Sequence, residues 1–318
     1  MRALVTGGAG FIGSHLADRL VADGHDVTVV DDLSTGRAAN LAAATAGGRC
    51  RLVVADIAGP ALPDAVREAA PEVVFHLAAQ IDVRASVADP IADAATNVVG
   101  TVAVLEAARR ARARKVVFAS SVAIFGPPRA LPVTEDAPTD PLSPYAVSKL
   151  AGELYLRQYR HLHGLDTTTV VLTNTYGPRQ DAHGEAGAVA IFTAALVAGR
   201  PTRIFGDGGN LRDYLYVADA VDALVRAAGP AATGRRVLVG TGIGTTDREL
   251  HRLIAGAVGT DAAPEPAPAR LGDLRAMVVD PAGAAAELGW RPHTPLAEGI
   301  ARTVTAARTT AAAPAPVA

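Results

Sequence analysis

The first fifteen residues constrain the fold of this chain more than any other stretch. A short apolar run at residues 3–5 leads directly into glycines at positions 7, 10 and 13, and an apolar helical pattern comes next. In such a pattern Gly7 permits a tight turn, Gly10 lets backbone approach a pyrophosphate, and Gly13 lets the helix pack closely on the sheet. The N-terminus of the helix would then face the phosphates. Glycine-rich turns without a ligand are also common, so the interpretation depends on the residues beyond this helix.

A second buried strand at residues 27–30 ends in Asp31 and Asp32. A carboxylate at this strand end accepts hydrogen bonds from the adenosine ribose hydroxyls, and we assign that role to Asp31. A phosphate on the ribose would meet two carboxylates, a repulsion of ~1 kcal/mol per close pair in water and ~4 kcal/mol at an effective dielectric constant of 20. The pair therefore favours NAD over NADP. Two alternatives stay open: the acids only begin the turn at 33–36, or Arg37 receives a 2′-phosphate.

Composition narrows the class of protein. The chain has 318 residues, of which 49% are hydrophobic and 19% charged, as expected of one large or two fused globular domains. The net charge is −2 and the basic residues are scattered, so we expect no nucleic-acid or membrane partner. Cys50 is the only cysteine, which excludes a disulfide framework and suits a reducing compartment. With no apolar run near ~18 residues and no signal peptide, we expect a cytoplasmic protein.

Strands and helices alternate along the first half of the chain. We predict further strands at 52–57, 73–80 and 115–119, with a crossover helix over 96–112. This order predicts an α/β fold with a Rossmann-type, doubly wound parallel sheet, whose ligands bind at the carboxyl ends of the strands.

Two of these strands end in candidate cofactor contacts. Asp56 and Ile57 close the third strand on the adenine side, although Asp56 could equally cap a helix. The fourth strand runs into small residues that would let backbone lie against the cofactor, and the candidates are Leu77, Ala78, Ala79 and Gln80. His76 lies inside an apolar run and is interpreted as a core histidine, because no second ligand stands at metal-binding spacing.

Tyr145 and Lys149 form the chemical centre of the prediction. They lie four residues apart at the start of a helix predicted to run through Leu162, so their side chains are adjacent on one face. A neighbouring ammonium, together with a positively charged nicotinamide, would favour the phenolate and lower the tyrosine pKa from near 10. Ser121 stands at the preceding strand end and could hold the substrate oxygen beside the phenol. The alternative is an exposed helix pair, which the preceding strand–helix unit and Ser121 disfavour.

These features resemble one protein family. The chain is similar to the extended short-chain dehydrogenase/reductase family of nucleotide-sugar enzymes, most of all to its UDP-glucose (UDP-galactose) 4-epimerases, from the start to about residue 303. The segments that carry the resemblance are 7–13, 76–80, 120–126, Tyr145 with Lys149, 174–180, 212–217 and 270–273.

The resemblance implies NAD as cofactor, a UDP-sugar substrate, a homodimer and no metal. It places Phe11 and Ile12 beside the cofactor with the glycines, and Tyr145 and Lys149 beside the nicotinamide. The implied substrate contacts are Ser121, Tyr145, Asn174, Val189, Arg212, Arg270 and Asp273. Guanidinium groups suit a diphosphate because they form paired hydrogen bonds with phosphate oxygens, although either arginine alone could be a surface ion pair.

The same resemblance suggests a division of the chain. We expect an NAD-binding Rossmann domain at 1–167 and a smaller α/β nucleotide-sugar-binding lobe at 168–310, with the chain free to cross back to the first domain. An alanine- and proline-rich tail at 311–318 should be disordered.

The residues after Ser121 bear on the reaction. Dehydratases and decarboxylases of this family carry an acid there, whereas this chain has Val122 and Ala123, which cannot move a proton. Epimerisation at C4 needs no such acid. Phe125 in place of tyrosine, and Val171-Leu172 in place of Arg-Tyr or Arg-Phe, depart from the epimerases and leave the sugar and the epimerised carbon open. The alternatives are a UDP-glucuronate or UDP-N-acetylhexosamine 4-epimerase, a 4-ketoreductase, or a non-catalytic NAD-binding sensor.

Overall fold

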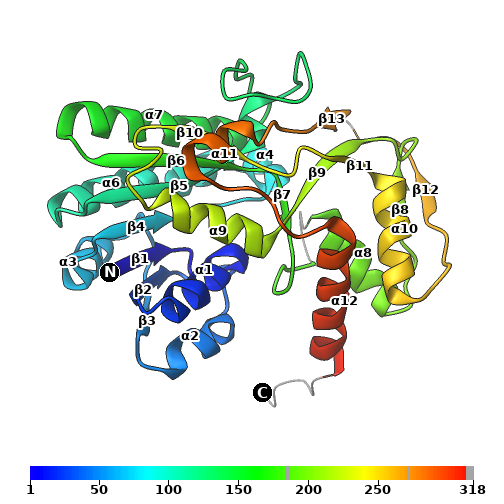
Figure 1. Cartoon of the computed structure of the whole chain (residues 1–318), viewed down its shortest axis with the longest axis horizontal. Helices are drawn as coiled ribbons and strands as arrows, with labels where there is room; N and C mark the ends of the chain where they lie inside the picture. Colours follow the sequence, from blue (N-terminus) through cyan, green and yellow to red (C-terminus); the bar gives the residue numbers. More distant parts are fainter. Residues whose placement is uncertain (183–186, 271–272, 313–318) are drawn as a thin grey trace.

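A seven-stranded parallel sheet forms the centre of the molecule. It is seen in a computed structural model that describes residues 1–182, 187–270 and 273–312 (Figure 1). The strand order is β10-β6-β5-β4-β1-β2-β3, and every neighbouring pair is parallel. The strands are β1 (Arg2–Thr6), β2 (Asp26–Asp31), β3 (Cys50–Val54), β4 (Val73–His76), β5 (Lys115–Ser121), β6 (Asp166–Leu172) and β10 (Arg236–Val239). The predicted doubly wound sheet is confirmed.

Helices cover both faces of this sheet because its central strands are apolar on both sides. In β1, Val5 packs with Leu16 and Leu224 in one core, whereas Leu4 packs with Val104 and Leu156 in the other. The first layer contains α1 (Phe11–Ala22) and α9 (Val217–Ala227), and the second contains α3 (Leu62–Ala69), α6 (Gly100–Arg110) and α7 (Pro144–His163). Shorter helices complete this part: η1 (Ala38–Leu41), α2 (Ala42–Ala46), α4 (Val83–Ala88), α5 (Pro90–Ala94), η2 (Ala95–Val99), η3 (Val122–Phe125) and α11 (Ala282–Leu288).

The helical run Pro90–Arg110 is long and apolar enough to span a membrane by composition alone. Its inward residues Val104, Leu105 and Ala108 are completely buried in the second core, and Arg109 and Arg110 occupy its last turn. This packing is that of a core helix of an α/β domain.

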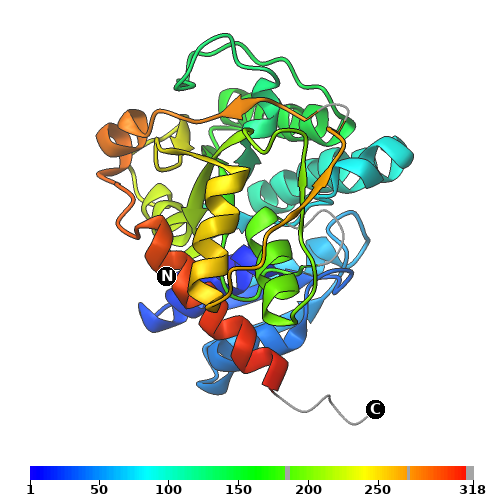
Figure 2. The ribbon, with the colours of Figure 1, turned by 90° about the vertical axis from the view of Figure 1, so that its right-hand side faces the viewer.

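The remaining elements form a smaller lobe beside the carboxyl ends of the large sheet. Strand β7 starts two residues after β6 ends and pairs with β9, which also pairs with β11 and β13, and a two-stranded sheet joins β8 and β12. Figure 2 views the molecule from this side. The elements are β7 (Asn174–Tyr176), α8 (Ala188–Val197), β8 (Arg203–Phe205), β9 (Leu211–Tyr216), β11 (Gly244–Thr246), α10 (Asp247–Val258), β12 (Glu265–Ala267), β13 (Ala276–Met277) and α12 (Leu296–Ala312).

Several predicted boundaries differ from the structure. Strand β3 ends at Val54, so Asp56 and Ile57 lie in the following turn, and β4 ends at His76. The division into two domains stays a prediction; residues 167 and 168 both lie in β6, and β10 belongs to the same sheet. Helix α12 includes residues 311 and 312, and the rest of the predicted tail, 313–318, lies outside the described residues.

Candidate active site

The glycine turn after β1 is tightly packed. Gly7 has a φ of +69° and donates its N–H to the Val30 carbonyl at 2.9 Å. A Cβ on Gly7 would lie 2.7 Å from the Ala78 nitrogen, and a Cβ on Gly13 only 2.2 Å from the Gly7 oxygen. The turn, the first helix and the loop after β4 are therefore in direct backbone contact, which requires glycine at both positions.

The N-terminus of α1 is open toward this turn. Its N-cap is Gly10, no side chain caps it, and a Cβ on Gly10 would meet only the Gly7 oxygen, at 3.2 Å. Phe11 and Ile12 follow in the first turn and are half-buried. Amide groups at an uncapped helix N-terminus need an acceptor, and a pyrophosphate provides one. The residues present thus fit a dinucleotide.

Asp31 lies at the end of β2, where the ribose contact was predicted. It is 6% exposed, and its carboxylate accepts hydrogen bonds from the backbone N–H groups of Ala9 (2.9 Å) and Leu33 (2.8 Å). Each carboxylate oxygen has a second lone pair, so the side chain can tie the glycine turn to β2 and still accept from a hydroxyl. Asp32 is exposed and accepts hydrogen bonds from Ser34.

The remaining candidates on the adenosine side are Arg37, Asp56 and Ile57. Arg37, the alternative receptor for a 2′-phosphate, forms an exposed ion pair with Asp181 at 3.6 Å. Asp56 is exposed and accepts from the Ala58 N–H, so its carboxylate closes a turn. The Ile57 side chain is buried in the core, where it occupies the space that a Cβ on Gly100 would need.

His76 is a core histidine, as predicted. Its Nδ1 lies 2.7 Å from the Thr6 hydroxyl and its Nε2 lies 2.9 Å from the Thr101 hydroxyl. Because Thr101 donates to the Asn97 carbonyl, it accepts from His76 Nε2–H, which leaves Nδ1 to accept from Thr6. Burial, with the Lys149 charge, lowers the pKa of His76 to about 3. The imidazole is therefore neutral and structural.

A polar network follows the predicted backbone contacts at Leu77, Ala78, Ala79 and Gln80. Asn97 accepts from the Gln80 N–H and donates to the Gln80 carbonyl, Asp93 and the Ser148 hydroxyl. Asp93 is 1% exposed, and Gln80 Nε2 donates to its Oδ1. This network joins the end of β4 to helix α7, which carries Tyr145.

Tyr145 and Lys149 share one face of α7, as predicted. Ser143 caps this helix by accepting from the Ala146 N–H. Lys149 is buried, its Nζ donates to the Ala119 carbonyl at 3.1 Å, and it lies 6.0 Å from the centroid of the Tyr145 ring. Ser121 at the end of β5 hydrogen-bonds to the Tyr145 phenol. The three predicted catalytic side chains are thus brought together.

The pKa of Tyr145 in the protein alone lies above its usual value. Burial raises it, the Ser121 hydrogen bond opposes the shift, and the Asp93 charge adds to it. Burial lowers the pKa of Lys149 to about 8, against the opposing charges of Asp93 and Glu153. Desolvation is the largest influence on the phenol in the protein alone, so the predicted lowering of its pKa requires the positive charge of the nicotinamide.

The predicted substrate residues other than Ser121 and Tyr145 lie in the smaller lobe. Arg212 on β9 pairs with Thr245 of β11 and Met277 of β13. The charges of Arg212, Arg270 and Asp273 all act on Asp247 at the start of α10. The Arg270 guanidinium stacks 3.6 Å from the centroid of the Phe205 ring. Leu271 and Gly272 of the same motif lie outside the described residues.

Asn174 and Val189 complete the predicted set. Asn174 is half-buried and donates to the Asp213 carbonyl at 3.3 Å. Val189 is 1% exposed and its side chain packs in the first core, so only its backbone can contact a ligand.

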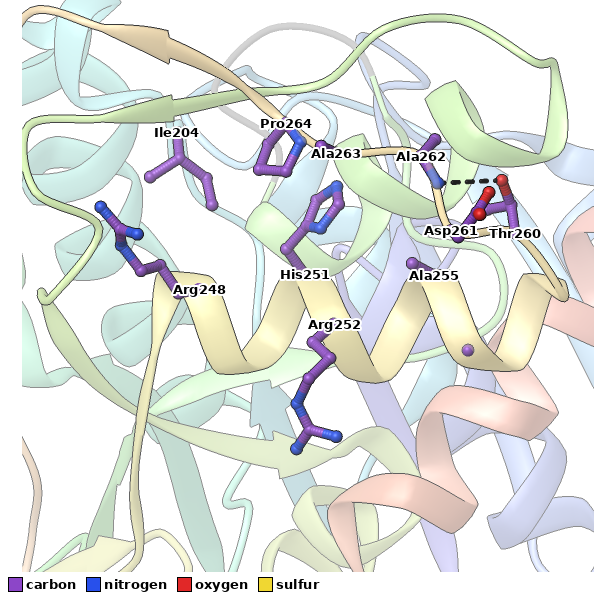
Figure 3. A pocket seen from close by; sticks show the side chains of 11 residues that line it. Ile204, Arg248, His251, Arg252, Ala255, Thr260, Asp261, Ala262, Ala263 and Pro264 are labelled. Atoms are coloured by element: carbon purple, nitrogen blue, oxygen red, sulfur yellow. Dashed lines mark hydrogen bonds between the residues drawn. The ribbon is translucent and has the colours of Figure 1, made fainter.

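A hollow of about 500 Å³ lies elsewhere on the smaller lobe (Figure 3). Helix α10 and the chain at 260–264 form it, with Arg248, His251 and Arg252 projecting from the helix. None of the predicted catalytic, cofactor or substrate residues lines it.

Comparison with known proteins agrees with the geometry of the site. The sequence profile described as "NAD dependent epimerase/dehydratase family" matches residues 3–240. A UDP-glucose 4-epimerase of Mycolicibacterium smegmatis is 57% identical over 305 residues, which cover 96% of this chain and 97% of that protein. The chain belongs to the NAD-dependent epimerase/dehydratase family. The predicted family and NAD as its cofactor are confirmed.

Solved structures of this family match the whole chain. A UDP-glucose 4-epimerase of Thermotoga maritima with UDP-glucose has a TM-score of 0.92 at 39% identity, covering 98% of this chain and 100% of that one. A UDP-glucose 4-epimerase of Thermus thermophilus in complex with NAD has a TM-score of 0.88 at 41% identity, covering 97% and 99%. The whole fold, including the smaller lobe, is therefore that of the epimerase/dehydratase family.

The structure also adds residues that the sequence analysis missed. Asp93 and Asn97 are buried next to the catalytic helix α7, Glu153 is buried on that helix, and Arg236 reaches it from β10. Glu153 stands four residues after Lys149, a spacing that could have identified it. No local pattern points to Arg236, because it comes from a strand 83 residues further along the chain.

Proposed function

We propose that this chain is a UDP-glucose 4-epimerase that uses NAD and passes through a transient 4-keto sugar. The observation that carries the proposal is the meeting of Ser121, Tyr145 and Lys149 at the carboxyl edge of the sheet, beside an apolar segment. Val122 and Phe125 of that segment are buried. The hydroxyl pair can move one proton, and no side chain after Ser121 can remove water or a carboxyl group. The epimerases that match the chain at 57%, 39% and 41% identity support the same activity.

In this mechanism Tyr145 takes the proton from the sugar 4-hydroxyl and later gives it back. When bound, NAD would supply the hydride acceptor and donor for C4 of the sugar. Ser121 hydrogen-bonds to the Tyr145 phenol, so it can hold the sugar oxygen in line for this transfer. Lys149 stabilises the phenolate as a nearby cation.

The open N-terminus of α1, the Gly7–Gly13 contact and Asp31 would hold NAD. Arg212 and Arg270 would bind the UDP diphosphate, with Asn174, the Val189 backbone and Asp273 beside them. Both guanidinium groups lie close enough to the half-buried Asp247 to act on its pKa, and such groups suit a diphosphate because they form paired hydrogen bonds with phosphate oxygens.

The two departures from the epimerase pattern lie in the core. Phe125 is 2% exposed, Val171 is completely buried, and both pack in a small cluster with Leu238 and Met277. Their side chains are enclosed by protein, so they are compatible with UDP-glucose as substrate. UDP-glucuronate, UDP-N-acetylhexosamines and 4-keto sugars remain the alternative substrates.

A panel of UDP-sugars with product analysis by NMR tests this function. UDP-glucose and UDP-galactose should interconvert, and deuterium placed at C4 should stay at C4 with none entering from solvent. Preferred turnover of another UDP-sugar would reassign the substrate. NAD release from denatured protein without turnover of any sugar would favour the non-catalytic sensor.

We further propose a cytoplasmic homodimer. Helices α4, α5, η2 and α7 pack against one another, and together they expose six apolar side chains: Val87, Ile91, Val99, Val147, Leu154 and Leu162. Exposed apolar surface of this kind is characteristic of an interface, and the family resemblance makes a second copy the occupant. Analytical ultracentrifugation should show a dimer that Val147→Glu with Leu154→Glu converts to a monomer. Ile243→Glu, an exposed control in the smaller lobe, should leave the dimer intact.

The division into an NAD-binding domain and a substrate lobe also remains a proposal. We now assign β6 and β10 to the NAD-binding domain, because both belong to its sheet.

A further inference from the structure

Glu153 is a buried carboxylate that the proposed mechanism does not use. It follows Lys149 by one helical turn on α7, and its side chain is 5% exposed. Its Oε1 accepts from the Ser120 hydroxyl at 2.5 Å, and its Oε2 accepts from Arg236 Nε at 2.7 Å and Nη2 at 2.5 Å. A buried carboxylate with charged and neutral donors on both oxygens has a fixed position.

Its partners connect it to both halves of the catalytic pair. Ser120 directly precedes Ser121 at the end of β5. Lys149 donates to the carbonyl of Ala119, one residue earlier on the same strand. Glu153 and Lys149 are therefore attached to consecutive residues of one strand end, and they stand side by side on one helix.

The groups around Lys149 come from four elements. Tyr145 and Glu153 lie on α7, Asp93 on α5 and neutral His76 on β4, and the Phe118 ring of β5 lies 5.1 Å from the Lys149 Nζ. Among the described residues that act on Lys149, Asp93 and Glu153 carry negative charge. The ammonium is buried, so these two carboxylates decide whether it keeps its proton near neutral pH.

We propose that Glu153, held by Ser120 and Arg236, is a positioning residue that keeps Lys149 as an ammonium ion beside Tyr145 and fixes the strand end that presents Ser121. The inference rests on the proposed function, because it assigns the residue that maintains the charge of the catalytic lysine. Burial raises the pKa of Glu153, and Arg236, Ser120 and Lys149 oppose that shift. The fork of Arg236 favours the carboxylate form.

The same geometry gives a reason for Val171. Ser120 pairs with Val171 across β5 and β6, and Val171 pairs with Leu238 of β10. Side chains in register lie on one face of a sheet, so an arginine at 171 would point to the same face as Ser120 and Glu153. Arg236, two residues before Leu238, supplies the guanidinium from the next strand instead.

Two lysines in the whole sequence, Lys115 and Lys149, make a direct test practical. NMR of protein labelled with 13C at the lysine Cε should show two resonances, assigned with Lys149→Met. In Glu153→Gln the midpoint of the Lys149 titration should fall by about one pH unit or more, the effect of losing an opposite charge one helical turn away. Lys115, paired with Asp166, serves as the internal reference and should not move.

Ser120→Ala is the matched control, because it removes the hydrogen bond and keeps the carboxylate. Its Lys149 midpoint should stay at the wild-type value. The high-pH side of the kcat/KM profile should show the same difference between the two variants. Glu153→Gln should lose about fivefold in kcat/KM at pH 8 and little at pH 6.

An unchanged Lys149 midpoint in folded Glu153→Gln overturns the proposal. If that variant does not fold, the double variant Glu153→Gln with Arg236→Gln removes both buried charges. The Lys149 midpoint of the double variant should still fall, by a smaller amount, and an unchanged midpoint would equally overturn the proposal. The NMR titration needs no turnover. A wild-type protein inactive on UDP-glucose would therefore refute the proposed function and leave the result at Lys149 standing.

Discussion

Gly13→Ala tests the cofactor cradle with the smallest possible perturbation. The added methyl carbon would lie 2.2 Å from the Gly7 oxygen, 2.7 Å from the Gly8 Cα and 2.9 Å from the Gly7 carbonyl carbon. All three atoms belong to backbone, so no side chain can rotate away. Restoring a separation of 3.0 Å moves the turn and α1 apart by about 0.8 Å.

Two effects of opposite sign set the magnitude. Alanine in a helix is favoured over glycine by about 1 kcal/mol, whereas overpacking against fixed backbone costs about 1–3 kcal/mol. We expect a net loss of about 1 kcal/mol in the free energy of unfolding, the middle of the resulting range of about 0–2 kcal/mol, and a Tm lower by about 2 °C. Because the shift moves the phosphate-binding amides, NAD affinity should fall by about tenfold or more.

Calorimetry and the NAD released from purified, denatured protein measure both quantities. Gly256→Ala in α10 is the matched control: a Cβ there meets no atom within 4 Å, so stability should hold or rise and NAD content should not change. Wild-type Tm and full NAD content in Gly13→Ala would refute the packing argument for the cradle.

Three further predictions concern the catalytic and substrate residues. Tyr145→Phe should fold, retain NAD and bind UDP-glucose yet lose about 100- to 10,000-fold in kcat, and full activity in that variant would exclude Tyr145 as the base. Arg270→Ala or Arg212→Ala should weaken UDP binding by roughly 1.5–3 kcal/mol in calorimetric titration without loss of NAD, and unchanged affinity in both would misplace the substrate site. Folding lowers the pKa of Lys149 from 10.5 to about 8, so the unfolded chain binds more protons than the folded chain between these pH values. The free energy of unfolding of the wild type should therefore rise relative to that of Lys149→Met by about 3 kcal/mol from pH 8 to 10.5. A constant difference between the two proteins in denaturant unfolding across that range would contradict the burial argument.

The hollow on α10 is not the predicted catalytic site. Its lining includes none of the residues predicted to transfer a proton from the sugar or to bind the diphosphate. The catalytic residues instead line an edge where strands end, and they are recognised by their chemistry and by their place in the sheet.

Much of the fold follows from short-range patterns in the sequence. The alternation of apolar runs and helical stripes predicts the parallel sheet, because each segment's period decides which face it buries. Gly7 and Gly13 specify the turn locally, and Tyr145 and Lys149 meet because residues four apart share a helix face. Ser121 could be placed beside them because parallel strands end at one edge.

The tertiary structure alone decided the electrostatics of that site. Glu153 is paired with Arg236 from a strand 83 residues away, and burial raises rather than lowers the pKa of Tyr145. Both depend on which side chains exclude water, a property of packing between distant segments. The sequence by itself therefore determined which groups carry out the chemistry, whereas the folded chain determined their charge, because desolvation and long-range ion pairs exist only after the sheet has formed.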